Sequence, residues 1–318
     1  MHYKITIVIV NYRSWNYLSK CIDSILNQKF NKPEIIIVDN FSNDGKITEF
    51  KSKYPNIQWI ELDYNSGFSK ACNIGAKESK TEWILFLNPD SILPNKCLNN
   101  LIPFCEKNNL GVISIRSKNA YLNKSFSHGF YFNFWTVTNF IRQFYLLFNR
   151  NKRKIKILDG FKVIMVGWVS GSFLLIKKKN FEIIGGWDER FWMYSEDMDF
   201  GKRAFENKIY PCVIYDLDYY HMHGGSSRKN NKIKLITKSE LIVSKHIFID
   251  KHLYGFEKKM SHYLLILVTT LNLIPLFPFS SFHRSLFFRL FRYWRKSIKK
   301  NEWKSLFRDK KISEILDN

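Results

Sequence analysis

The sequence predicts an α/β fold built on a largely parallel sheet. Strand-like runs alternate with helical patterns through residues 1–220, which is the order expected of strands joined by crossover helices. Each run is followed by polar residues, as at the edge of such a sheet where ligands bind. At roughly 100–200 residues per domain, a chain of 318 residues predicts one large domain with an appendage.

The individual elements follow from local pattern. The first run, residues 5–10, begins almost at the N-terminus and is too short and too β-branched for a signal peptide, so a cytoplasmic protein is expected. Five cysteines without close CxxC or Cys/His spacing predict neither a disulfide framework nor a zinc site. Strands are expected at 5–10, 34–38, 57–62, 83–87 and 112–115, and helices at 15–27, 46–53, 69–78 and 95–107.

The polar residues that follow these strands are candidates for ligand binding. An aspartate after the second strand can accept a hydrogen bond from a ribose hydroxyl or a base N–H, and a glycine after the third lets the backbone approach a phosphate. A carboxylate after the fourth strand suits Mg²⁺, which needs only one or two carboxylates beside substrate phosphates. Ordinary turns and caps are the alternative. In chain order these residues are Asn11 and Tyr12, Asp39, Asn65 and Gly67, and Asn88 and Asp90.

Residues 187–200 combine five carboxylates with aromatic side chains where a helix is expected to begin. Ser195 is expected to cap this helix, and Glu196 and Asp197 fall in its first turn, where the helix dipole favours negative charge. This leaves Asp197 free to face a cleft. A well-capped surface helix is the alternative.

The formal charge of +22 is concentrated in blocks, which predicts an anionic partner. Residues 284–311 carry eleven Lys/Arg and two acids, and apolar and basic residues alternate there as in a helix at a membrane interface. The apolar segment 263–279 contains two prolines and is shorter than the about 20 residues of a membrane span, so a re-entrant or surface-lying hairpin is expected. A basic helical appendage packed on the main domain is the alternative, and without a recognised nucleic-acid module no nucleic acid is expected.

Several short motifs together resemble the inverting glycosyltransferases of family 2, most closely their bacterial rhamnosyltransferase-like branch. They include Asn88-Pro89-Asp90 and Ser195-Glu196-Asp197, and their order and spacing are more specific than any one of them. The resemblance implies a GT-A fold, in which a Rossmann-like nucleotide half is joined to an acceptor half. The matching segments are 8–12, 38–45, 65–75, 86–90, 169–172, 186–189, 195–199 and 221–227.

On this resemblance, 1–230 is the transferase domain, with a nucleotide half at 1–115, an aromatic and basic insertion at 118–160 and an acceptor half at 160–230. Residues 231–318 form a helical, basic, membrane-associating region. The insertion, with a basic run at 142–156, is either an acceptor-side element or a second membrane-facing patch.

The resemblance also implies residue roles. Asp197 corresponds to the catalytic base, and Asp90 with His221 to the ligands of a divalent cation, Mg²⁺ or Mn²⁺. His223 is the alternative histidine, and Asn88 replaces the first carboxylate of the family's Asp-x-Asp motif, which leaves strict metal dependence open. The implied donor-binding residues are Asn11, Tyr12, Asp39, Asn65, Gly67, Asn73 and Asn88, and the implied acceptor-binding residues are Trp187, Asp188, Glu196 and Trp192.

The expected function is transfer of a sugar, with a rhamnose-like deoxysugar favoured, from a dTDP- or UDP-sugar to a polyprenyl-diphosphate-linked saccharide in cell-surface polysaccharide biosynthesis. The enzyme is expected on the cytoplasmic face of the membrane. The alternative is a non-catalytic membrane- or nucleic-acid-binding protein on a decayed transferase fold, because a fold does not guarantee a function.

Overall fold

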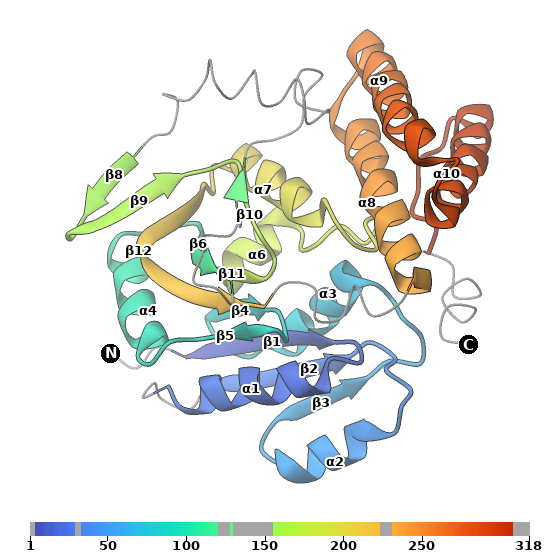
Figure 1. Cartoon of the computed structure of the whole chain (residues 1–318). Helices are drawn as coiled ribbons and strands as arrows, with labels where there is room; N and C mark the ends of the chain where they lie inside the picture. The colour runs from blue at the N-terminus through green and yellow to red at the C-terminus, as the bar shows by residue number, and fades with distance from the viewer. Residues whose placement is uncertain (1–3, 29–32, 120–127, 130–154, 223–230, 308–318) are drawn as a thin grey trace.

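A mixed sheet of ten strands organises the molecule (Figure 1). The computed structural model describes residues 4–28, 33–119, 128–129, 155–222 and 231–307. The strand order is β3-β2-β1-β4-β11-β6-β12-β9-β8, with β5 also paired to β12. The strands are β1 (Ile5–Asn11), β2 (Glu34–Asp39), β3 (Gln58–Glu61), β4 (Trp83–Leu87), β5 (Ser91–Ile92), β6 (Val112–Lys118), β8 (Ile155–Leu158), β9 (Phe161–Met165), β11 (Phe173–Lys177) and β12 (Pro211–His221).

The first half of the sheet is the parallel unit that the sequence predicts. β1 pairs in parallel with β2 and β4, and β2 pairs in parallel with β3. The expected α/β fold is confirmed, and the predicted strands and helices of the first 115 residues are present. The helices of this half are α1 (Trp15–Leu26), α2 (Lys46–Lys53), α3 (Phe68–Glu78) and α4 (Cys97–Lys107).

The second half of the sheet is mixed. β11 is antiparallel to both β4 and β6, whereas β12 is parallel to β6 and antiparallel to β9. Two short strands, β7 (His128–Gly129) and β10 (Trp168–Val169), form a separate pair. The helices here are α6 (Lys178–Ile184) and α7 (Glu196–Glu206). The insertion predicted at 118–160 lies mostly outside the described residues.

Alternation along β1 distributes its side chains to two cores. Ile5, Ile7 and Ile9 pack in the core with residues of α1, α2 and α4, whereas Val8 packs in the core with residues of α3, α6 and α7. Successive side chains of a strand point to opposite faces, so a continuously apolar strand indicates helices on both sides of the sheet.

Three long helices follow β12 along the chain: α8 (Asn231–His252), α9 (Gly255–Leu273) and α10 (Ser281–Lys300), with the 3₁₀ turn η2 (Ile274–Leu276) between the last two. They form the layer at the upper right of Figure 1. The hydrophobic core of these helices includes Phe191 and Met198 from residues 187–200, the stretch rich in carboxylates and aromatic side chains. The predicted helical C-terminal region is therefore confirmed, and it packs on the domain built around the sheet.

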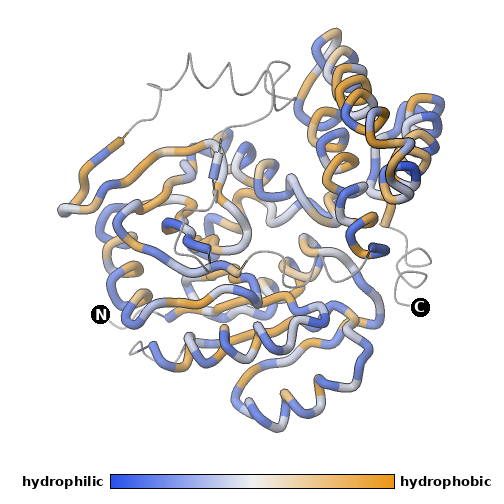
Figure 2. The backbone as a smooth tube through the Cα atoms, in the orientation of Figure 1, coloured by the Kyte–Doolittle hydropathy of each residue, from blue (hydrophilic) through white to orange (hydrophobic). Residues whose placement is uncertain are grey.

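The helical stretch that contains most of the predicted apolar segment 263–279 begins before that segment, at Gly255. Within the described chain, one helical stretch, Gly255–Leu276, has the length and composition of a membrane-crossing helix, and 28% of its most apolar window is buried. Figure 2 shows hydrophobic and hydrophilic turns alternating along α9 and α10. The exposed large apolar side chains of α9 and η2 are Phe256, Met260, Tyr263, Leu267, Leu271, Ile274 and Leu276.

Gly67 joins the two halves at the start of α3. Its φ of 83° lies in the left-handed region, and a Cβ added there would meet the carbonyl oxygen of Trp192 at 2.4 Å. The backbone N–H of Phe68 donates to that same oxygen at 2.7 Å. The glycine therefore admits the backbone of Trp192, a contact that the sequence analysis did not anticipate.

We predict that Gly67→Ala lowers the free energy of unfolding more than Gly160→Ala does. Both glycines have φ of 83°, but nothing lies within 4 Å of a Cβ at Gly160. Gly160→Ala carries only the backbone strain of about 1–2 kcal/mol, and Gly67→Ala adds the clash with Trp192. Urea titrations compare the two variants, and equal losses would contradict the close approach.

Candidate active site

The carboxyl ends of β1 and β2 meet around a buried carboxylate, Asp39. Asn11 Nδ2 donates to Asp39 Oδ1 at 2.8 Å, and the Ser42 hydroxyl donates to the same oxygen at 2.6 Å. The backbone N–H of Ser42 donates to Oδ2 at 3.0 Å. Burial raises the pKa of Asp39, while the hydrogen bonds from Ser42 and Asn11 oppose that rise. The structure thus brings together Asn11 and Asp39, two of the residues predicted to bind the nucleotide-sugar donor, in a preorganised group of hydrogen-bonding side chains.

A second polar network holds the loop after β3 beside this group. Asn40 Nδ2 donates to Asn65 Oδ1 and to the carbonyl of Gly67, both at 3.2 Å. The N–H of Ser66 donates back to Asn40 Oδ1 at 2.8 Å. Asn65 therefore shapes the loop through its side chain. Tyr12, another predicted donor residue, lies at the end of β1, under the guanidinium of Arg13.

The predicted metal ligands lie side by side. Nε2 of His221 is 3.0 Å from Oδ1 of Asp90 and 3.4 Å from Nδ2 of Asn88, and both Asp90 and His221 are buried. Their proximity comes from β5, whose Ser91 is opposite His221 in an antiparallel pair with β12. His223, the alternative histidine, lies outside the described residues.

These three side chains fit an incomplete cation site. The described residues include no group of three or more His, Cys, Asp or Glu side chains that could hold a metal ion. One carboxylate, one imidazole and one amide suit Mn²⁺ or Mg²⁺ only if phosphate oxygens of a substrate complete the coordination sphere. Asp90 and His221 are thus the residues that would hold such an ion.

Asp197 lies in the first turn of α7, next to a strained turn of the backbone. Tyr194 and Ser195 both have positive φ, 70° and 60°, and such strain in two consecutive non-glycine residues is a feature of functional sites. The prediction that Ser195 caps the helix is wrong: its side chain makes no capping bond, and its hydroxyl lies 3.2 Å from that of Ser244 in α8. The left-handed backbone turns that side chain to α8 instead.

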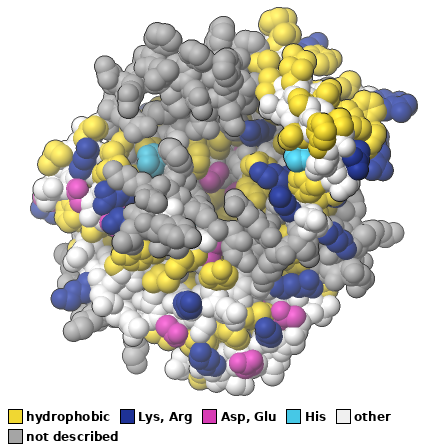
Figure 3. Space-filling view, in the orientation of Figure 1, with side chains coloured by type: hydrophobic (Ala, Val, Ile, Leu, Met, Phe, Trp, Pro, Cys, Tyr) yellow, Lys and Arg dark blue, Asp and Glu magenta, His cyan; other side chains and the backbone are white. Residues whose placement is uncertain are grey.

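Burial raises the pKa of Asp197 to about 7, opposed by a hydrogen bond from the Met198 N–H at 2.8 Å. The side chain keeps partial exposure, so it remains open to a ligand while the surrounding protein excludes much of the water. A carboxylate with a pKa near the working pH is suited to general base catalysis. Acidic side chains are visible near the middle of the face drawn in Figure 3.

Glu196 differs from its neighbour because it is buried and its Oε2 makes no hydrogen bond to the described residues. Burial, followed by the nearby charge of Asp197, raises the pKa of Glu196 well above its usual value. The environment of Glu196 therefore favours its neutral form beside the candidate base, and a buried neutral acid of this kind can donate a hydrogen bond.

Two other carboxylates of the segment hold the structure together. Asp188 accepts from Arg190 at 2.7 Å and from Lys251 of α8 at 2.6 Å. Asp199 is fully buried and accepts from Arg203 at 2.8 Å and from His252 at 2.7 Å, with Lys251 also paired to it. Asp188, predicted to bind the acceptor, is thus engaged in ion pairs with Arg190 and α8.

Both tryptophans predicted to contact the acceptor are buried. The Trp187 ring lies 4.8 Å from Phe200 and 5.3 Å from Phe86, and 1% of the residue is exposed, so its ring packs in the core of this structure. Trp192 is 6% exposed, donates its indole N–H to the Asn65 carbonyl at 3.3 Å and packs on Phe307. Its ring links the donor-side loop to the C-terminal segment.

Asn73, predicted to lie near the nucleoside, makes its hydrogen bonds to the loop at 187–189. Its Nδ2 donates to the Trp187 carbonyl at 2.8 Å and to Glu189 at 3.0 Å, and its Oδ1 accepts from the Trp187 N–H at 2.9 Å. Asn73 therefore clamps the loop at 187–189 to α3.

Two residues that contribute to the site, Ser42 and Tyr219, were not predicted from the sequence. Ser42 supplies two hydrogen bonds to Asp39, and its position three residues after Asp39 is the spacing of a local turn, so a signal was present. Tyr219, fully buried, shares a short hydrogen bond with Ser172 (2.7 Å) and stacks on His221. No local pattern marks Tyr219, because its partner is 47 residues away.

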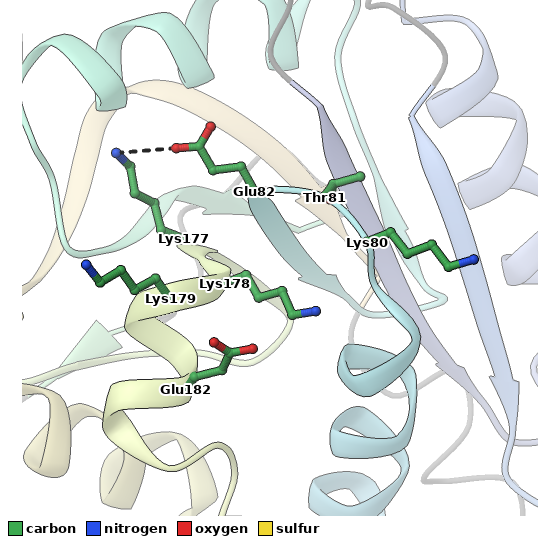
Figure 4. A pocket seen from close by; sticks show the side chains of 7 residues that line it. All are labelled: Lys80, Thr81, Glu82, Lys177, Lys178, Lys179 and Glu182. Carbon is green, nitrogen blue, oxygen red and sulfur yellow. Dashed lines mark ion pairs between the residues drawn. The ribbon is translucent and has the colours of Figure 1, made fainter.

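A separate hollow of about 580 Å³ lies at the other end of the central strands (Figure 4). Its residues, including Lys80, Glu82 and Lys177, come from the entry to β4 and from the junction of β11 with α6. Asn88 and Asp90 follow the carboxyl end of β4, so this hollow does not belong to the candidate site.

Comparison with known proteins agrees with this geometry. The sequence profile described as "Glycosyl transferase family 2" matches residues 6–166, half of the chain. The chain belongs to glycosyl transferase family 2. This match covers both groups at the carboxyl edge of the first strands, around Asp39 and around Asp90, but not Asp197.

Curated relatives of this family 2 chain include several bacterial transferases. It is 27% identical to the rhamnosyltransferase WbbL of Escherichia coli over 61% of this chain and 74% of that protein. It is 23% identical to the N-acetylglucosaminyl-diphospho-decaprenol L-rhamnosyltransferase of Mycobacterium tuberculosis over 62% of this chain and 69% of that protein. It is 38% identical to a poly(ribitol-phosphate) beta-glucosyltransferase of Bacillus spizizenii over 33% of this chain, but the match spans only 18% of that longer protein.

Solved structures of transferases share the fold. TarS of S. aureus superposes with a TM-score of 0.52 at 18% identity, over 87% of this chain and 44% of TarS. GalNAc-T7, solved with UDP, GalNAc and Mn²⁺, gives a TM-score of 0.55 at 14% identity, over 82% of this chain and 54% of that chain. The predicted GT-A arrangement is confirmed by these likenesses, and at such identities they establish the fold alone.

We predict that Asp199→Asn lowers the free energy of unfolding by about 3 kcal/mol or more at pH 7, because it leaves buried cationic partners without their carboxylate. Burial alone would raise the pKa of Asp199, but His252, Arg203 and Lys251 hold it below its usual value. Its stabilisation is therefore present above the unfolded-state pKa of about 3.9 and is lost as the pH falls.

Chemical denaturation at several pH values measures this effect. The matched control is Glu61→Gln, which breaks an exposed pair with Lys51 and should cost about 1 kcal/mol or less. Similar losses in both variants, or a loss that does not shrink below about pH 4, would contradict the role given to Asp199.

Proposed function

We propose that this protein is an inverting glycosyltransferase that moves a sugar from a nucleoside-diphosphate donor to a lipid-linked saccharide, with a rhamnose-like deoxysugar as the favoured donor sugar. The observation that carries the proposal is the convergence of the Asp39 group with the Asp90–His221 pair at the carboxyl edge of β1, β2 and β4, the edge where nucleotides bind in such sheets. We also propose a role in cell-surface polysaccharide biosynthesis, which relatives named for teichoic acid synthesis support.

In this proposal Asp39, with Asn11 beside it, accepts from the ribose or base of the donor. The ends of β1 and β2 hold both groups before a ligand arrives, which lowers the ordering cost of binding. TarS has been solved with UDP and with UDP-GlcNAc, which supports a nucleotide-sugar donor for this chain too. dTDP- and UDP-sugars are both candidates.

The proposed reaction is a single displacement. The acceptor hydroxyl oxygen forms a bond to the anomeric carbon while the bond from that carbon to the diphosphate oxygen breaks, and the nucleoside diphosphate leaves with the electron pair. Asp197 takes the proton of the acceptor hydroxyl, and Glu196 offers a neutral donor next to it. A Mg²⁺ or Mn²⁺ ion held by Asp90 and His221 would neutralise charge that develops on the leaving diphosphate.

A polyprenyl-diphosphate acceptor requires the enzyme to work at a membrane. The decaprenol-linked substrate in the name of the mycobacterial relative supports this acceptor class. The exposed apolar residues of α9, together with the basic residues of α10, support peripheral attachment to an anionic membrane. We therefore propose a location on the inner face of the cell membrane.

We predict that Asp197→Asn lowers kcat by about 10²–10⁴-fold while folding and nucleotide binding persist, because an amide cannot accept the hydroxyl proton. In the wild type, kcat should rise with pH around a midpoint near 7, where Asp197 loses its proton. Glu206→Gln, on an exposed position of the same helix, should behave as wild type. Near-normal turnover in Asp197→Asn, or a midpoint near 4, would remove Asp197 from this role.

The function is tested by measuring hydrolysis and transfer across a panel of dTDP- and UDP-sugars with and without Mg²⁺ or Mn²⁺. We expect one donor to turn over, and chelation to stop the reaction. His221→Gln should raise the metal concentration required for half-maximal activity, and the matched variant His223→Gln should leave it unchanged. Absence of both nucleotide binding and turnover would overturn the proposed function in favour of a non-catalytic binding protein.

A further inference from the structure

A hollow of about 320 Å³ lies between α10 and the segment that follows it, and its lining includes none of the residues assigned to donor and acceptor. Arg289, Arg292, Lys296 and Lys300 recur along α10 at intervals of three or four residues, which places them on one side of the helix. Lys304 contributes a fifth cation from the following segment, and Glu302 is the one acid in the lining. The lining therefore carries a net charge of +4.

The backbone builds this hollow by reversing direction after α10. Asn301 has a left-handed backbone conformation, and its backbone N–H donates to the Ile298 carbonyl at 3.3 Å. The backbone N–H of Glu302 donates to the Ser297 carbonyl at 3.1 Å. This is the geometry of a helix C-terminus that ends in a left-handed residue. Residues 302–307 consequently return beside the helix.

The returning segment is fixed by aromatic packing. Trp303 stacks against His246 and His262, with ring centroids 4.4 and 4.0 Å apart. Phe307 is buried between Arg289, whose guanidinium lies 5.0 Å from its ring, and Trp192. Both walls of the hollow are thus held by a packed core.

The charges of the hollow are only partly compensated. Glu302 pairs with Lys304 at 3.3 Å, and Arg289 interacts with the charge of Glu240. Among the described residues no carboxylate is ion-paired with Arg292, Lys296 or Lys300. Favourable interaction with the helix dipole accounts for the cations in the last turn of α10, but not for Arg289 and Arg292, which lie before that turn.

Polar groups on the floor of the hollow add hydrogen-bonding capacity. Ser297 and Ser305 line it, and the buried hydroxyl of Tyr293 makes no hydrogen bond of good geometry within the described chain, although Ser297 and the backbone of Lys304 lie near it. Burial lowers the pKa of Arg289, the charge of Glu240 opposes that fall, and the charge of Arg292 adds to it.

We propose that this hollow is a binding site for a phosphate or diphosphate group. Guanidinium and ammonium groups form charge-assisted hydrogen bonds to phosphate oxygens, and the hydroxyl groups supply further donors. The phosphate can belong to a soluble ligand or to a lipid headgroup. Figure 3 shows hydrophobic side chains gathered at the upper right, over α9 and α10, with Lys and Arg side chains at their margin. Phe288 and Phe291, both half-exposed, lie on α10 itself, which favours the lipid source.

The test uses the full chain and two probes: inorganic pyrophosphate measured by calorimetry without divalent cations, and vesicles of phosphatidylglycerol and phosphatidylcholine measured by co-sedimentation. The test variant is Arg292→Gln with Lys296→Gln. The matched control is Arg295→Gln with Lys299→Gln, which removes the same charge from exposed positions of the same helix outside the lining. Circular dichroism verifies that all variants are folded, and none of the readouts depends on donor turnover.

We expect the test variant to weaken binding of at least one probe about tenfold or more, and the control to stay within about twofold of wild type. Loss with pyrophosphate identifies a soluble phosphate ligand, and loss with anionic vesicles alone identifies a lipid headgroup. Equal losses in the two variants would indicate general electrostatic attraction and overturn the site. Failure of the wild type to bind either probe would overturn it as well.

Discussion

The buried carboxylate of Asp199 is the interaction on which the arrangement of the molecule depends. It lies in the first turn of α7, two residues after the candidate base, and it receives Lys251 and His252 from the end of α8. Arg203 closes the group from the same helix as Asp199. Because these charges are removed from water, α7 and α8 have little freedom to separate, and the position of Asp197 depends on a helix that lies outside the segment matched by the family profile.

The neighbouring carboxylates illustrate how environment gives identical groups different chemistry. Cationic side chains beside Asp188 and Asp199 hold the pKa of each below its usual value, whereas burial and the charge of Asp197 raise the pKa of Glu196. Asp197 lies between these limits, with a pKa near neutrality. The side chains that distinguish these carboxylates include Lys251 and His252, more than 50 residues away in the chain, so no local reading of the segment could assign the roles.

The parts of the fold that were predictable are those governed by local pattern. The strand at 5–10 and the helix at 15–27 are marked by β-branched runs and helical periodicity, and both are present as β1 and α1. The pairing of β5 with β12 could not be predicted from periodicity, because it joins residues about 130 positions apart; only the motif resemblance placed His221 near Asp90. The packing of Trp187 and Gly67 could not be predicted for a common reason: it is set by residues that meet them only in the folded chain, Phe200 in one case and Trp192 in the other.

The contact of Phe307 with Trp192 has a consequence for how the protein is made. Trp192 donates to the loop at Asn65, beside the donor side of the sheet, and one side of its ring is covered only after the chain has passed α10 and turned back. During translation β1 to β4 can pair before the rest of the chain leaves the ribosome, whereas the bonds of Phe68 and Asn73 to residues 187–192 form later. The turn before α7, which carries Trp192, gains its contact with Phe307 only when residue 307 has been synthesised, so the order of synthesis separates pairing of the first strands from completion of this turn.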